Sequence, residues 1–115
     1  STALLMNDDR FPWVILVPRR PDMRDLVDLN EADAGAASGE IRGVSRAMKS
    51  LFKPHKLNVA ALGNMVPQLH IHIIARFSED AAWPRPVWGV GDRKPYAAAL
   101  RDERIGMLKA ALGIG

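Results

Sequence analysis

The chain has no cysteine, a single tyrosine, only three histidines and no long apolar run in its 115 residues. Without cysteine it can form neither a disulfide nor a thiolate metal site. Its longest apolar run, Trp13 to Pro18, is far too short to cross a bilayer. Residues 1–10 also lack the basic start and apolar stretch of a secretory signal. We therefore expect a soluble, cytoplasmic protein without a membrane partner.

Composition indicates one globular domain spanning residues 1–115, with 48% hydrophobic and 25% charged residues. A net charge of +3 and a pI near 9.7 suit phosphate-bearing ligands but do not by themselves indicate nucleic acid. One basic row has helical spacing and consists of Arg42, Arg46, Lys49 and Lys53. We interpret this row as the solvent face of a helix. The alternative is a module that lies along a nucleic-acid backbone.

The apolar pattern predicts an α+β fold, in which an antiparallel sheet of about five strands packs against one long helix, with a C-terminal helix added. The strand-like segments are residues 3–6, 11–17, 57–62 and 68–74. The segment 11–17 is apolar throughout, so we expect a central strand covered on both faces. The long helix should begin after the N-cap residue Asn30 and stop at Pro54, and residues 95–111 should form the second helix.

The segment 68–74 reads QLHIHII and alternates between polar and apolar residues, as a half-buried strand does. One face would carry Leu69, Ile71 and Ile73. The other face would carry Gln68, His70, His72 and, at its end, Ile74. A tight turn at Gly63-Asn64 would join this strand to the preceding one as a hairpin. The pattern therefore predicts two imidazoles side by side on one surface.

Several of these residues also carry a resemblance to a known family. They are Asn58, Gly63 and the run Gln68-x-His70-x-His72. The pattern resembles the histidine-triad (HIT) superfamily of nucleotide hydrolases and transferases, whose signature alternates three histidines with apolar residues after a glycine-bearing turn. A strand ending in Val-Pro-Arg-Arg, a long helix and a tail with tryptophan and proline follow the same order. The resemblance covers roughly residues 4 to 90.

The resemblance implies that His70 is the nucleophile, which attacks an α-phosphorus and forms a nucleotidyl-histidine. Its other ring nitrogen should be held by a backbone carbonyl, and His72 should reach the phosphate or the leaving group. Gly63 and Asn64 would offer N–H groups to phosphate oxygens, and Asn58 would hold phosphate or ribose. The implied substrate is a purine nucleotide or nucleotide conjugate, such as a dinucleoside polyphosphate or a nucleoside phosphoramidate. No metal or cofactor is implied, and two copies are expected to pair as a homodimer.

The sequence departs from the family pattern at two positions. Gln68 stands at the first triad position, and Pro21 stands where relatives often have a histidine. Glutamine can donate and accept hydrogen bonds but cannot shuttle a proton at neutral pH. The related galactose-1-phosphate uridylyltransferases carry a glutamine at another triad position, so catalysis is compatible with the change. The alternative is a nucleotide-binding sensor or adaptor that has lost its acid–base partners.

Two further features have alternative interpretations. A His-x-His pair can bind zinc, with His55 or a carboxylate as a third ligand, although the sequence supplies no other ligand cluster. The segment 81–89 contains two tryptophans together with proline and glycine, which excludes regular structure. These tryptophans either complete the core or line a ligand cleft, in this chain or in a partner subunit.

Overall fold

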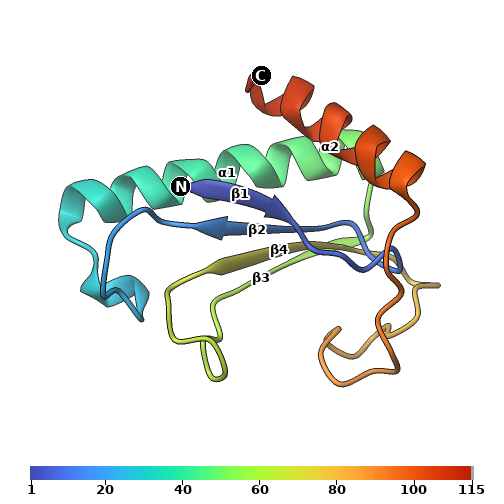
Figure 1. Ribbon diagram of the computed structural model, residues 1–115, viewed down its shortest axis with the longest axis horizontal. Coiled ribbons are helices and arrows are strands. Elements are labelled where there is room, and N and C mark those ends of the chain that lie inside the picture. Colours follow the sequence, from blue (N-terminus) through green and yellow to red (C-terminus); the bar gives the residue numbers. More distant parts are fainter. Residues whose placement is uncertain (115) are drawn as a thin grey trace.

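The computed structural model describes residues 1–114 and shows an antiparallel sheet with two helices on one of its faces (Figure 1). The strands are β1 (Thr2–Leu5), β2 (Trp13–Val17), β3 (Lys56–Ala60) and β4 (Ile71–Arg76), in the spatial order β1-β2-β4-β3. The helices are α1 (Glu31–Phe52) and α2 (Ala98–Leu112), and a short 3-10 turn (Leu26–Asp28) precedes α1. The predicted α+β fold is confirmed.

The described residues contain four strands instead of the expected five or so. The long connection between β4 and α2 could have supplied a fifth strand, but it is rich in proline and glycine and joins no ladder. Proline cannot donate to a ladder and glycine weakens one, which accounts for the smaller sheet. β2 lies between β1 and β4, as predicted for the most apolar segment.

The main core lies between the sheet and the helices. Val14 and Leu16 of β2 pack there with Ile71 and Ile73 of β4 and with Met48 of α1. The helix α1 begins where predicted, because the Asn30 side chain accepts a hydrogen bond from the backbone N–H of Asp33 at 2.8 Å. It ends at Phe52, and Lys53 follows in the left-handed conformation that often closes a helix.

The opposite face of the sheet is covered by loops. Figure 1 shows the β3–β4 loop and the segment before α2 on the side of the sheet away from the helices. A second core cluster lies there and consists of Phe11, Trp13, Ile74, Ala82 and Val87. The covering segment is tied to the β1–β2 turn, because Arg10 Nη1 donates to the Val90 carbonyl at 2.6 Å and the Tyr96 N–H donates to Asn7 Oδ1 at 2.9 Å. The segment before α2 is thus fixed by specific hydrogen bonds.

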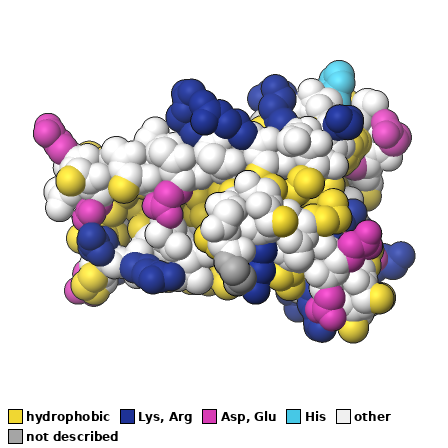
Figure 2. Space-filling model, turned by 90° about the horizontal axis from the view of Figure 1, so that it is seen from above, with side chains coloured by type: hydrophobic (Ala, Val, Ile, Leu, Met, Phe, Trp, Pro, Cys, Tyr) yellow, Lys and Arg dark blue, Asp and Glu magenta, His cyan; other side chains and the backbone are white. Residues whose placement is uncertain are grey.

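The helical face carries the basic row of α1 and an apolar hollow. Figure 2 looks onto this face and shows Lys and Arg side chains scattered along it. Arg42, Arg46, Lys49 and Lys53 are all exposed, as the solvent-face interpretation predicts. Within residues 1–114, neither helix combines the length and apolar character that a bilayer crossing requires.

Candidate active site

The strands β3 and β4 form the predicted antiparallel pair, with Ala60 opposite His72. The connection is longer than the predicted two-residue turn at Gly63-Asn64, because β4 begins only at Ile71. Pro67 lies in the connecting loop and cannot donate to a ladder, so the pairing cannot continue through it to that turn. Gly63 has a φ of +70°, which only glycine adopts readily, so the chain does bend there.

His70 is half-buried and lies just before β4, where its ring is fixed by its own chain. Its Nδ1 lies 2.6 Å from the backbone carbonyl oxygen of Gln68. A carbonyl can only accept a hydrogen bond, so Nδ1 carries the ring proton and donates it. The Nε2 atom of the neutral ring therefore presents a lone pair. This is the arrangement predicted for a nucleophilic histidine.

His72 lies within β4 and is buried, with 6% of its surface exposed. Its Nδ1 is 3.0 Å from Nε1 of Trp13. An indole N–H can only donate, so Nδ1 accepts and the proton of the neutral imidazole resides on Nε2. Burial, and next the neighbouring His70, lower the pKa of His72 from 6.5 to about 4. His72 is therefore neutral at physiological pH.

The two histidines lie on the same side of the sheet, as predicted. Their ring centroids are 4.9 Å apart. Two indoles contact His72 in T-shaped geometry, with centroid distances of 5.0 Å to Trp88 and 5.6 Å to Trp13. Within the proline-containing loop, Trp88 thus lies against His72, whereas Trp83 packs in T-shaped geometry against His55 at 5.0 Å. His72 is thus flanked by the rings of His70, Trp13 and Trp88, and by the cross-strand neighbours Ile15 and Ala60.

The side chain of Gln68 is engaged away from the imidazoles. Its Nε2 donates to the backbone carbonyl of Arg20 at 3.3 Å, in the segment that follows β2. Pro21 is exposed next to that carbonyl. The contribution of Gln68 to His70 is therefore its backbone carbonyl, which any residue at this position could supply.

The three residues predicted to bind phosphate lie in two places, with Asn58 in β3 and both Gly63 and Asn64 in the β3–β4 loop. Asn58 is half-buried on the same face as His72, but its Oδ1 already accepts a hydrogen bond from Arg76 Nη1 at 2.9 Å. A ligand would therefore meet the amide NH2 of Asn58. Gly63 and Asn64 lie in the β3–β4 loop, where Asn64 is exposed.

Sequence reasoning missed a buried ion pair next to this site. Arg76 and Asp80 form two hydrogen bonds, of 2.8 and 3.1 Å, and their side chains are only 1% and 4% exposed. Arg76 also donates to the Arg85 carbonyl at 2.7 Å. Burial alone would raise the pKa of Asp80, but hydrogen bonds from Arg76 and from three backbone N–H groups lower it to about 2. The pair fastens the loop after β4 to the sheet.

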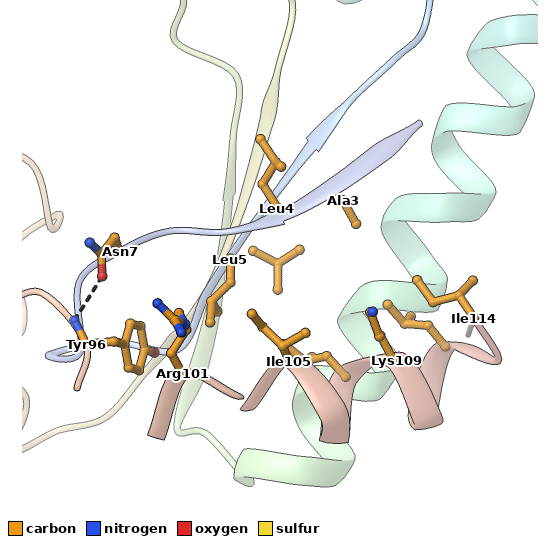
Figure 3. Close-up of a pocket in the computed structure, with 12 residues that line it drawn as sticks. Ala3, Leu4, Leu5, Asn7, Tyr96, Arg101, Ile105, Lys109 and Ile114 are labelled. Carbon is orange, nitrogen blue, oxygen red and sulfur yellow. Dashed lines mark hydrogen bonds between the residues drawn. The ribbon is translucent and has the colours of Figure 1, made fainter. Parts of the chain in front are cut away.

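A hollow lies on the helical face, between β1 and α2, and has a volume of about 410 Å³. Figure 3 shows Ile105 of α2 beside Leu5 of β1 in this hollow, with Lys109 farther along α2 toward Ile114. Its lining is mostly aliphatic, and the two histidines lie on the opposite face of the sheet. Among residues 1–114, no group of three His, Asp or Glu side chains is arranged to hold a metal ion. The histidine pair is therefore the candidate reactive centre.

Most of the chain is similar to known proteins. The family model described as HIT domain matches residues 1–79. A histidine triad protein from Bradyrhizobium japonicum, known from a crystal structure, is 49% identical with a TM-score of 0.95, over 97% of this chain and 84% of that chain. A histidine triad protein from Marinobacter aquaeolei VT8 is 44% identical with a TM-score of 0.93, over 96% of this chain and 81% of that chain.

Curated relatives are more distant. Two proteins of Mycobacterium tuberculosis, from strains CDC 1551 / Oshkosh and ATCC 25618 / H37Rv, carry the name AP-4-A phosphorylase. Each is 29% identical to the chain over 99 residues, which cover 79% of this chain and 48% of the relative. The chain therefore spans about half the length of the curated relatives it matches.

Proposed function

The chain belongs to the HIT domain family, and on this premise we propose that it is a nucleotide hydrolase or nucleotidyl transferase that acts at an α-phosphate through His70. One observation carries the proposal. The Nδ1 of His70 donates to the Gln68 carbonyl at 2.6 Å, which leaves Nε2 as the nucleophilic atom. The name of the curated relatives supports a nucleotide conjugate as the substrate. We also place Gln68 at the first position of the family's triad.

The proposed reaction has two displacement steps. In the first, the Nε2 lone pair of His70 forms a bond to the α-phosphorus, and the bond from phosphorus to the leaving group breaks. In the second, the oxygen of water or of another acceptor attacks the same phosphorus. The electron pair of the N–P bond then returns to His70, and the proton of the acceptor passes to solvent. Such a covalent intermediate divides one difficult displacement into two easier ones.

The strand register indicates where the nucleotide would lie. Leu4, Ile15, His72 and Ala60 are opposite one another in successive strands and form one row across the sheet. Leu4 is 50% exposed, so the β1 end of this row presents an apolar surface, with Ile15 between Leu4 and His72. We propose that the base packs on Leu4 and Ile15 while the phosphate lies at His70. Gly63, Asn64 and the NH2 group of Asn58 are then the proposed phosphate donors.

A nucleotide-binding sensor or adaptor is the second candidate function. It is favoured by the absence of a proton donor, because the Gln68 side chain is bound to the Arg20 carbonyl and His72 is neutral at pH 7. Calorimetry and product analysis on the unmodified protein separate the two candidates. An enzyme should bind nucleoside monophosphate and release it from a dinucleoside polyphosphate. Binding without any release, across a panel of dinucleoside polyphosphates and phosphoramidates, would support the sensor.

We also propose that two copies of the chain pair. β3 is an edge strand of the sheet, and Val59 within it is 49% exposed. An exposed edge with apolar side chains favours pairing with another chain. Sedimentation velocity should therefore show a species of twice the 12.7 kDa chain mass, and Val59→Lys should shift it toward the monomer. A monomer at all concentrations of the unmodified protein would contradict this proposal.

A further inference from the structure

The hydrogen bond between Trp13 and His72 suggests that Trp13 does more than pack against the imidazole. We infer that Trp13 is a positioning residue that holds His72 as a neutral Nε2–H donor, and that the site consequently selects substrates whose leaving group departs as a stable anion. Nucleoside polyphosphates belong to this class, and nucleoside phosphoramidates with amine leaving groups do not. The inference rests on the proposed function, because it concerns the same reaction.

Trp13 is held firmly enough to impose a tautomer. It opens β2, is only 3% exposed, and packs against the rings of Phe11 and Trp88 at centroid distances of 6.5 and 5.6 Å. Within residues 1–114, every buried side-chain nitrogen and oxygen has a hydrogen-bond partner, and that of the Trp13 N–H is His72. Leaving this N–H unpaired in the interior would be unfavourable, because the buried donor would have lost its hydrogen bond to water without a replacement. The bond therefore favours His72 with an unprotonated Nδ1.

The two imidazoles consequently have opposite tautomers. His70 carries its proton on Nδ1, fixed by the Gln68 carbonyl, and His72 carries its proton on Nε2, fixed by the Trp13 indole. At a centroid separation of 4.9 Å, one ring offers a lone pair and the other offers an N–H to the same ligand. This division of roles between the two rings suits a single displacement step. In that step His70 attacks phosphorus while His72 donates a hydrogen bond to a phosphoryl or leaving-group oxygen.

A hydrogen bond from a neutral imidazole is not a proton transfer. To become an acid, His72 would have to gain a proton on Nδ1, where two N–H groups would then face each other across 3.0 Å. Burial also lowers the pKa of His72, and His70 is the titratable group that faces it. At neutral pH the site thus assists the leaving group through a hydrogen bond only.

The leaving group determines whether this is sufficient. When the bond between the α-phosphorus and the bridging oxygen of a polyphosphate breaks, the electron pair stays on that oxygen and the product is a stabilised anion. When a phosphorus–nitrogen bond breaks, the electron pair stays on an amide nitrogen, which requires a proton in the transition state. Neutral His72 cannot transfer that proton, and the Gln68 side chain carries none to give. The anhydride should therefore react much faster than the amide.

The tautomer can be measured without turnover. A long-range ¹H–¹⁵N spectrum of the unliganded, ¹⁵N-labelled protein distinguishes protonated from unprotonated ring nitrogens. We expect an unprotonated Nδ1 and a protonated Nε2 for His72, and the reverse for His70. A protonated Nδ1 in His72 at pH 7 would overturn the inference. If both histidines had the expected protonated nitrogens but the protein released no nucleotide, that result would instead contradict the proposed function.

The selectivity can be tested with Trp13→Phe, which keeps an aromatic ring and removes the donor. The ratio of kcat/KM for a dinucleoside polyphosphate to that for a nucleoside phosphoramidate should fall at least about tenfold, or roughly 1.4 kcal/mol. The acid limb of the pH profile for the phosphoramidate should also move to higher pH, because Nδ1 of His72 can now be protonated. Trp88→Phe, which trims the other indole on His72 without removing a donor from it, should leave the ratio unchanged. An unchanged ratio in folded Trp13→Phe, or equal changes in both variants, would overturn the inference.

Discussion

His70→Ala is expected to lower the release of nucleoside monophosphate from a dinucleoside polyphosphate by at least about 10³-fold, or roughly 4 kcal/mol in activation free energy. The variant removes the atom that forms the covalent bond, and His72 cannot replace it because its Nδ1 is bound to Trp13 and its Nε2 carries the proton. Binding of the monophosphate should weaken far less than the rate. Product analysis and calorimetry on the same preparations measure both quantities.

A matched control comes from the third histidine of the chain. His55 is exposed and lies between α1 and β3, where it packs against Trp83 and not against the histidine pair. His55→Ala should therefore retain the turnover of the unmodified protein. If His70→Ala kept its fold and its turnover, the assignment of the nucleophile would be wrong.

Arg76→Met is expected to lower the free energy of unfolding by about 3–5 kcal/mol, because it leaves the carboxylate of Asp80 buried without its partner. Arg76 is 1% exposed and binds three groups, namely Asp80, Asn58 and the Arg85 carbonyl. Methionine preserves most of the side-chain volume, so the loss reports on charge and hydrogen bonds more than on packing. Denaturant unfolding followed by circular dichroism measures the change.

Three further variants, namely Arg24→Met, Asp80→Asn and the double variant Arg76→Met with Asp80→Asn, show whether the ion pair is the cause. Arg24→Met alters an exposed arginine and should change the stability by less than about 0.5 kcal/mol. The double variant Arg76→Met with Asp80→Asn removes both charges and should regain part of the loss, as coupled neighbours do. If the double variant lost as much free energy of unfolding as Arg76→Met and Asp80→Asn lose in sum, the two residues would not be coupled.

Acid provides an independent readout of the same pair. The pKa of Asp80 lies near 2 in the folded protein against an ordinary 3.8, so between these values the unfolded carboxyl binds a proton that the folded one does not. The stabilisation by Asp80 is therefore fully present above this range and is lost as the pH falls through it. Arg76→Met should reduce this dependence on pH, because the main partner that lowers the pKa of Asp80 is gone.

The elements and the face that carries both histidines can be predicted from the sequence, because both depend on local patterns. The alternation in 68–74 correctly separated Leu69, Ile71 and Ile73 from the two histidines, and the N-cap at Asn30 correctly marked the start of α1. The length of the β3–β4 loop is harder to predict, because Gly63-Asn64 resembles a hairpin turn, whereas Pro67 prevents the ladder from reaching it.

The interactions that fix the site could not be read from local patterns. Trp13 and His72 are 59 positions apart, and an apolar strand gives no sign that its tryptophan donates to an imidazole. Arg76 at a strand end looks like an ordinary surface residue, and only the folded chain reveals its burial with Asp80. A weak signal was available, since Arg76 continues the even-numbered series of Gln68, His70 and His72 and has an acid four residues later.

The most direct test of the account is the mass of the intact protein after it is mixed with a labile nucleotide donor and rapidly quenched. We expect a fraction of the chain to gain one nucleotidyl group, and peptide mapping should place that group on His70. The adduct should be absent from His70→Ala. Release of nucleoside monophosphate with no adduct at any time point, or with an adduct on a residue other than His70, would contradict the account.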